Sequence, residues 1–96
     1  MRKAEVIDRL KRAEPELRQS GVAALYLFGS YARDESDVDV FVDPASDATF
    51  GFIDYMDAYE AIRRYVGQDV EIGYSTRDGL SPYVRAGIES EAIRVF

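Results

Sequence analysis

The sequence predicts an α+β fold in which a small mixed or antiparallel sheet of about four strands is flanked by helices. Helical patterns open the chain and return in its middle, and short segments typical of strands lie between them. Residues 30–36 alone join the first two strands, fewer than the dozen or more residues of a parallel crossover that contains a helix. We therefore expect these strands to run antiparallel or to flank a single helical turn. The 96 residues predict one domain, 1–96.

Two helical segments are predicted at the start of the chain. Apolar residues recur at helical spacing among charged ones over residues 2–13, which is typical of an amphipathic helix. Pro15 cannot continue the hydrogen bonding of that helix but fits the first turn of a new one. We expect a short second helix or bent extension over residues 15–19, ended by Gly21.

Two strands follow. Residues 22–28, Val-Ala-Ala-Leu-Tyr-Leu-Phe, are almost continuously apolar, which predicts a central strand that is buried on both faces and ends at Gly29. Residues 37–42 alternate between acidic or aromatic side chains and valines. On a strand this alternation places Asp37 and Asp39 on one face and the valines on the other.

The second half of the chain repeats the two patterns. Apolar residues at helical spacing predict a long helix over 52–66, and Gly67 ends it. Residues 69–73 alternate between acidic and apolar side chains and predict a third strand. A serine and a proline then begin a terminal helix over about 82–90, and residues 92–96 form a short last strand.

The composition excludes several kinds of site. A net charge of −6 argues against binding a long nucleic acid, because that binding depends on clustered Lys and Arg. The chain has no cysteine and no histidine, which removes thiolate and imidazole metal sites and the commonest general base. No stretch approaches the length of a membrane span, so we expect a cytoplasmic protein that makes no membrane contact.

Asp37 and Asp39 are the first candidate site residues. Carboxylates side by side repel each other, so a fold keeps them together more readily when a cation neutralises them. Oxygen ligands favour Mg²⁺ or Mn²⁺ over zinc or copper. The alternative is that both residues are exposed charges of an edge strand, where they discourage pairing with another sheet.

Residues suited to phosphate and to an attacking group lie around this pair. The turn at Gly29 and Ser30 offers backbone N–H groups and a hydroxyl to phosphate oxygens, and Arg33 offers a guanidinium that steers them. Glu71, with Asp69 as the fallback, offers the third carboxylate that a transfer reaction needs to activate a hydroxyl when histidine is absent. The alternatives are an ordinary turn, a surface ion pair and exposed strand charges.

Three segments follow one another in the order of a known family. They are Phe-Gly-Ser-Tyr-Ala-Arg at 28–33, Ser-Asp-Val-Asp-Val at 36–40 and Val-Glu-Ile at 70–72. With them the chain resembles, over nearly its whole length, the minimal nucleotidyltransferases (MNT) of the DNA polymerase beta superfamily. The resemblance implies a nucleotidyltransferase fold of the polymerase beta type.

The resemblance also implies a role for each site residue. Gly29 and Ser30 hold the nucleotide triphosphate. Asp37 and Asp39 bind Mg²⁺, expected as two ions with Mn²⁺ as an alternative. Glu71 completes the catalytic and metal set near the attacking hydroxyl.

Stand-alone members of this family resemble the antitoxin half of HEPN/MNT toxin–antitoxin pairs. This implies a Mg²⁺-dependent protein adenylyltransferase that moves AMP from ATP to a hydroxyl, that of a tyrosine, of a partner HEPN toxin. We expect a hetero-oligomer with that toxin, and a homo-oligomer is the alternative. The chain has no room for the fingers or thumb that position a nucleic-acid template.

Two departures from the family keep other functions open. Only residues 31–36 separate the Gly-Ser turn from Asp-x-Asp, several fewer than in many members, and Glu71 stands where Asp is common. The short loop favours an alternative in which the chain neutralises its partner by binding it, with weak catalysis or none. A further alternative is the catalytic subunit of a two-chain transferase that modifies a small molecule.

Overall fold

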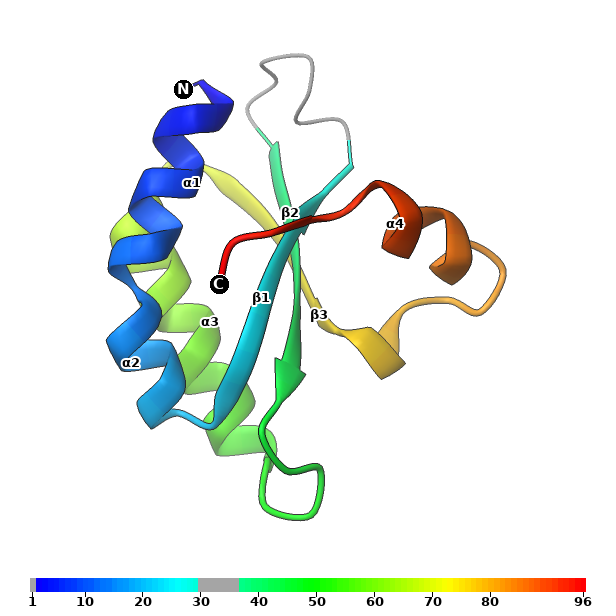
Figure 1. Cartoon of the computed structure of the whole chain (residues 1–96). Helices are drawn as coiled ribbons and strands as arrows, with labels where there is room; N and C mark the ends of the chain where they lie inside the picture. The colour runs from blue at the N-terminus through cyan, green and yellow to red at the C-terminus, as the bar shows by residue number, and fades with distance from the viewer. Residues whose placement is uncertain (1, 30–36) are drawn as a thin grey trace.

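A computed structural model describes residues 2–29 and 37–96, and it describes Asp37 by its backbone (Figure 1). The helices are α1 (Lys3–Arg12), α2 (Glu14–Gln19), α3 (Phe52–Val66) and α4 (Arg85–Glu91), with a 3₁₀ turn, η2 (Arg77–Gly79). The strands are β1 (Val22–Phe28), β2 (Asp37–Pro44), β3 (Glu71–Thr76) and β4 (Ile93–Arg94). The predicted α+β fold is confirmed. No helix within the described ranges is long and apolar enough to span a membrane.

The strands form one mixed sheet in the order β3-β2-β1-β4. β1 pairs antiparallel with both β2 and β4, which confirms the expectation drawn from the short connection at residues 30–36. β2 and β3 pair parallel, because α3 lies between them in the chain and carries the backbone back to the same end of the sheet. β3 is thus an edge strand beside the acidic strand β2.

The helices α1, α2 and α3 cover one face of the sheet, and α4 lies on the other side (Figure 1). The core lies under the three helices. Fully buried side chains from α1, α2 and α3 pack there against both central strands: Val6, Leu10, Leu17, Leu25, Leu27, Val38, Val40, Val42 and Ile62. The predicted alternation of β2 is confirmed, since its three valines are all 0% exposed in this core. The acidic face of β2 is therefore the face away from α1, α2 and α3.

Tyrosines of α3 join this helix to its neighbours. The Tyr55 and Tyr74 hydroxyls each donate a hydrogen bond to the other residue's carbonyl oxygen, at 3.2 and 3.0 Å, and their ring centroids lie 4.6 Å apart. Burial raises the pKa of Tyr74. On the other side Tyr65 Oη donates to Glu16 Oε1 at 2.8 Å, and this bond, with one from Arg64, lowers the pKa of Glu16. These contacts show that Tyr55, Tyr65 and Tyr74 join α3 to β3 and to α2.

The structure moves the bounds of several predicted elements. β2 runs on to Pro44, two residues farther than predicted, and β4 covers Ile93–Arg94 where residues 92–96 were predicted. β3 begins at Glu71, two residues later than predicted, because Gly67 has a positive φ of 130° and begins a turn in which Val70 N donates to Gly67 O. α4 begins at Arg85, because the residues before it form a turn whose carbonyl at Ser81 accepts from both Val84 N and Arg85 N.

Candidate active site

The register between β2 and β3 positions the acidic residues. Asp37 pairs with Glu71 and Asp39 with Gly73, so the backbones of the two predicted acidic positions, 37 and 71, are direct neighbours. Residues paired in a parallel ladder share a face, so Glu71 belongs to the face that carries Asp39. Glu71 is exposed, whereas Asp69 lies before the strand, in the turn that follows α3.

The carboxylate of Asp39 lies between two glycines. A Cβ built on Gly29 would come within 2.6 Å of Asp39 Oδ2, and a Cβ built on Gly73 would collide with Asp39 Oδ1. Gly29 also has a positive φ of 85°, which strains any other residue. Because both positions are glycine, the Asp39 carboxylate oxygens and any group that these oxygens bind have room beside the two neighbouring chain segments.

The sequence reasoning missed Gly73. Glycine inside a strand weakens it and often marks a place where another group approaches closely, so the signal was present in the sequence. The sequence could not show that Asp39 is the group that approaches Gly73, because this depends on which strand lies beside β3 and in which register. The structure supplies both, and they make Gly73 part of the candidate site.

Two predicted site residues, Ser30 and Arg33, lie outside the described residues, and their roles stay predictions. Among the described side chains, those of residues 2–29 and 38–96, no three acidic groups gather closely enough to hold a metal ion. The predicted set includes Asp37, which is described by its backbone. The donors nevertheless fit Mg²⁺ in kind, since they are carboxylate oxygens.

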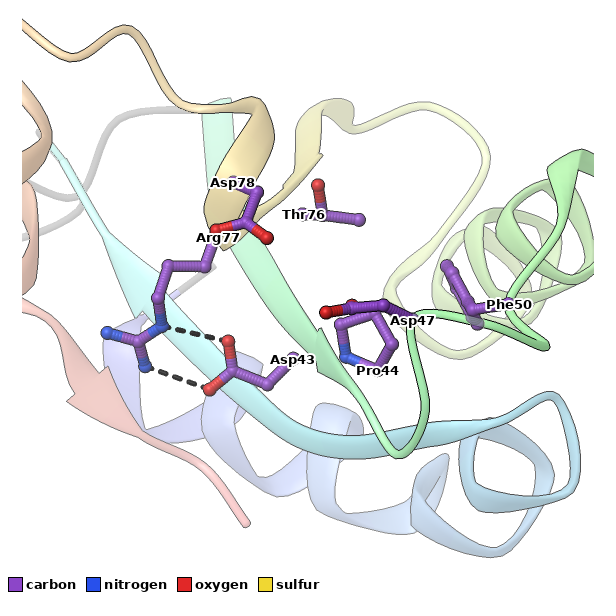
Figure 2. A pocket seen from close by; sticks show the side chains of 7 residues that line it. All are labelled: Asp43, Pro44, Asp47, Phe50, Thr76, Arg77 and Asp78. Carbon is purple, nitrogen blue, oxygen red and sulfur yellow. Dashed lines mark hydrogen bonds and ion pairs between the residues drawn. The ribbon is translucent and has the colours of Figure 1, made fainter.

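Farther along β2 the same face carries an aromatic and ionic cluster. Tyr26 stacks on Phe41 with ring centroids 4.7 Å apart, and the Arg77 guanidinium lies 4.9 Å from both centroids. Arg77 Nε and Nη2 donate to the two oxygens of Asp43 at 2.8 and 2.9 Å, as Figure 2 shows, and Nη1 donates to Glu89. The bonds to Asp43 raise the pKa of Arg77.

This cluster borders a cavity of about 410 Å³ at the far end of β2, with Phe50 and Thr76 among its other lining residues (Figure 2). Asp43 follows Asp39 by four strand positions, a separation of roughly 13 Å. The cavity is therefore separate from the Asp39 carboxylate. Asp43 shares a face with Asp39, but its carboxylate is paired with Arg77.

Comparison with known proteins identifies the family. Residues 5–95 match the model of the nucleotidyltransferase domain. The chain belongs to this family. Its resemblance to the minimal nucleotidyltransferases is thereby confirmed, and the chain is a nucleotidyltransferase. A Methanocaldococcus jannaschii protein named "Putative protein adenylyltransferase MJ1379" is 32% identical over 78 residues, which cover 77% of either chain.

Two solved structures share the fold. One is the tri-AMPylated Shewanella oneidensis HEPN toxin in complex with MNT antitoxin, with a TM-score of 0.63 at 18% identity, covering 94% of this chain and 71% of the matched chain. The other is a toxin–antitoxin with AMP-PNP, with a TM-score of 0.60 at 16% identity, covering 90% of this chain and 72% of the matched one. At these identities the structures support the fold, and they confirm the polymerase beta-like architecture.

Proposed function

We propose that this nucleotidyltransferase moves AMP from ATP to a tyrosine hydroxyl of a partner protein of the HEPN toxin type and so acts as its antitoxin. The curated relative is named as a protein adenylyltransferase, and one structure with this fold pairs an AMPylated toxin with an MNT antitoxin. A second such structure contains AMP-PNP, an ATP analogue, which supports ATP as the nucleotide. The partner and its tyrosine are carried to this chain by these likenesses.

The single observation that supports catalysis most is the register of β2 with β3. It makes positions 37 and 71 neighbours and sets Asp39 opposite a glycine. The alternative, that Asp37 and Asp39 are charges of an edge strand, is wrong, because β2 pairs with a strand on either side. We assign Asp37, Asp39 and Glu71 to the metal and catalytic set on this basis.

In the proposed reaction the acceptor oxygen forms a bond to the α-phosphorus of ATP. The bond from that phosphorus to the oxygen bridging the α- and β-phosphates breaks, and pyrophosphate leaves with the electron pair. The hydroxyl proton passes to the exposed carboxylate of Glu71 and from there to water. Pyrophosphate is a good leaving group, so positioning and charge neutralisation are the main demands on the protein.

The other residues hold the reactants. Asp37, Asp39 and Glu71 would hold Mg²⁺, which when bound supplies positive charge against the negative charge of the phosphoryl oxygens. Backbone N–H groups of the turn at Gly29 and the hydroxyl of Ser30 hold the phosphates, and Arg33 steers them. The chain itself carries a charge of −6, so a cation at this face also offsets the repulsion between the protein and the triphosphate.

The test is the intact mass of the partner. The purified product of the adjacent reading frame is incubated with this protein, ATP and Mg²⁺ and then weighed. We expect gains in multiples of one AMP, and no gain with EDTA. Asp39→Asn should slow the transfer by about a hundredfold or more, since it removes one of the charged oxygens that hold the metal. Asp8→Asn, on the exposed side of α1, is the matched control.

Two outcomes contradict the proposal. One is a partner whose mass does not change, and the other is an equal gain with Asp39→Asn. A partner that is neutralised without any gain in mass would identify the chain as a binding module.

A further inference from the structure

One tyrosine of the chain differs from the others in its surroundings. The side chain of Tyr83 is 97% exposed, and its hydroxyl makes no hydrogen bond to another described residue. The other tyrosines that the structure describes are half-buried. Three of them donate a hydrogen bond to an oxygen of the fold, and two lie against the guanidinium of an arginine: Tyr55, Tyr65 and Tyr74, then Tyr26 and Tyr59. Tyr83 is therefore the described tyrosine whose hydroxyl another molecule can reach without breaking a contact.

The segment that carries Tyr83 projects from the molecule. Residues 80–84 connect η2 to α4, and Figure 1 shows this connection extending beyond α4, away from the sheet. A backbone turn fixes it, because the carbonyl oxygen of Ser81 accepts hydrogen bonds from Val84 N and Arg85 N at 3.1 and 3.0 Å. The Tyr83 side chain takes no part in these bonds, so its replacement leaves the turn intact.

The charge of this segment suits it to the candidate site. Residues 79–84, Gly-Leu-Ser-Pro-Tyr-Val, carry no charge. The candidate site carries Asp39 and Glu71 and belongs to a chain of net charge −6. An acidic segment would be repelled from such a site, whereas an uncharged one meets no such opposition. A tyrosine in this segment can therefore approach the acidic face of a second, equally acidic molecule.

The anchoring of the segment separates Tyr83 from the site of its own chain. Arg77, at the start of η2, is bound to both carboxylate oxygens of Asp43. Asp43 lies roughly 13 Å along β2 from Asp39. From this anchor the chain runs outward, as Figure 1 shows, so the Tyr83 hydroxyl is presented to another molecule.

We propose that Tyr83 is itself an acceptor of AMP and that it is modified in the site of a second copy of this chain. This inference rests on the proposed function and adds to it an acceptor that the protein carries. Tyr83 Oη forms a bond to the α-phosphorus of ATP held by the second copy. The bond from that phosphorus to the oxygen bridging the α- and β-phosphates breaks, and pyrophosphate leaves with the electron pair. The hydroxyl proton passes to Glu71 of the second copy and from there to water.

The test is the intact mass of the protein after incubation with ATP and Mg²⁺ and no partner. We expect the wild type to gain AMP, with the added mass located on Tyr83 by peptide fragmentation, and no gain with EDTA. Tyr83→Phe should gain nothing. Tyr59→Phe, which removes the hydroxyl of a half-buried tyrosine, is the matched control and should gain as the wild type does. Tyr83→Phe should still modify the product of the adjacent reading frame at the wild-type rate, which shows that the variant is folded and active.

A mixture of two variants tests whether the transfer passes between molecules. Asp39→Asn keeps the acceptor tyrosine and loses the site, whereas Tyr83→Phe keeps the site and loses the acceptor. When they are mixed, the Asp39→Asn chain should gain AMP and the Tyr83→Phe chain should not. If the Asp39→Asn chain gains nothing while the wild type alone gains AMP, the transfer stays within one molecule and the inference is wrong.

The remaining outcomes separate the inference from the proposed function. If the wild type modifies the partner but not itself, or if Tyr83→Phe gains as much AMP as the wild type, Tyr83 is not an acceptor and the proposed function stands. If the chain modifies itself at Tyr83 but leaves the partner unchanged, the inference holds and the proposed partner is wrong. If neither protein gains mass, the proposed function and the inference are both wrong.

Discussion

At the scale of single residues, the position of the Asp39 carboxylate depends on the absence of a Cβ at two neighbouring glycines. Its two carboxylate oxygens occupy space that a Cβ at Gly29 or at Gly73 would take. The two glycines differ in kind, because Gly29 also has a positive φ, whereas Gly73 lies within β3, where other residues are at home. Gly73 is thus the position at which the space beside Asp39 can be changed with the least effect on the backbone.

Gly73→Ala should displace the Asp39 carboxylate and slow AMP transfer by about a hundredfold, since a shift of about 1 Å in a reacting group costs about that much. The thermal unfolding midpoint should change little, because alanine fits a strand at least as well as glycine. The measurement is the initial rate of mass gain of the partner, beside a thermal melt. Gly87→Ala in α4, where an added Cβ meets nothing within 4 Å, is the control. A wild-type rate for Gly73→Ala would mean that the position of Asp39 does not limit the reaction.

At the scale of elements, the segment from η2 to α4 is held to the sheet by charges. α4 buries none of its residues, and its contacts include Arg85 paired with Asp78 and with Glu89. The anchor is Arg77, whose planar guanidinium fits the carboxylate of Asp43 with two parallel bonds and lies over two aromatic rings. This side chain is only 27% exposed, so water screens its pairs less than those of α1.

Arg77→Met keeps much of the apolar contact with the two aromatic rings, but it removes the positive charge and the two parallel hydrogen bonds to Asp43. We expect the free energy of unfolding to fall by about 1–3 kcal/mol, because Asp43 and Glu89 lose their shared partner. Urea denaturation measures this value. Arg12→Met, which breaks an ion pair between side chains that are 68% and 58% exposed, should cost about 0.5 kcal/mol or less. Equal losses for the two variants would contradict the role given to Arg77.

The elements themselves were largely readable from the sequence. The apolar run at residues 22–28 and the alternation in β2 predict a buried strand and a two-faced strand, because side-chain periodicity depends on the local backbone alone. The anchor at Arg77 was not readable, since its partner Asp43 is 34 positions away and the pairing exists only once the chain crosses the sheet. The late starts of β3 and α4 follow from turns whose hydrogen bonds no periodic pattern reports.

At the scale of the whole molecule, the sheet separates stability from chemistry. One face packs under α1, α2 and α3, and the other carries Asp39, Glu71 and the aromatic cluster under Arg77. The sequence predicted which residues share a face. The strand order was not predicted, and this order places the Gly29 turn and Glu71 on opposite sides of β2. The sequence thus predicted the candidate site as a set of residues, whereas the structure supplied the arrangement of these residues in space.

The pairing of β2 with β3 brings Glu71, and not Asp69, beside the acidic strand. The most direct test is the rate of AMP transfer at saturating ATP and partner for Glu71→Gln and Asp69→Asn. Either change removes one carboxylate from an exposed position and keeps the shape of the side chain. Glu71→Gln should lower the rate by about a hundredfold or more, whereas Asp69→Asn should keep the wild-type rate. The reverse result, a rate lost with Asp69→Asn and kept with Glu71→Gln, would contradict the account.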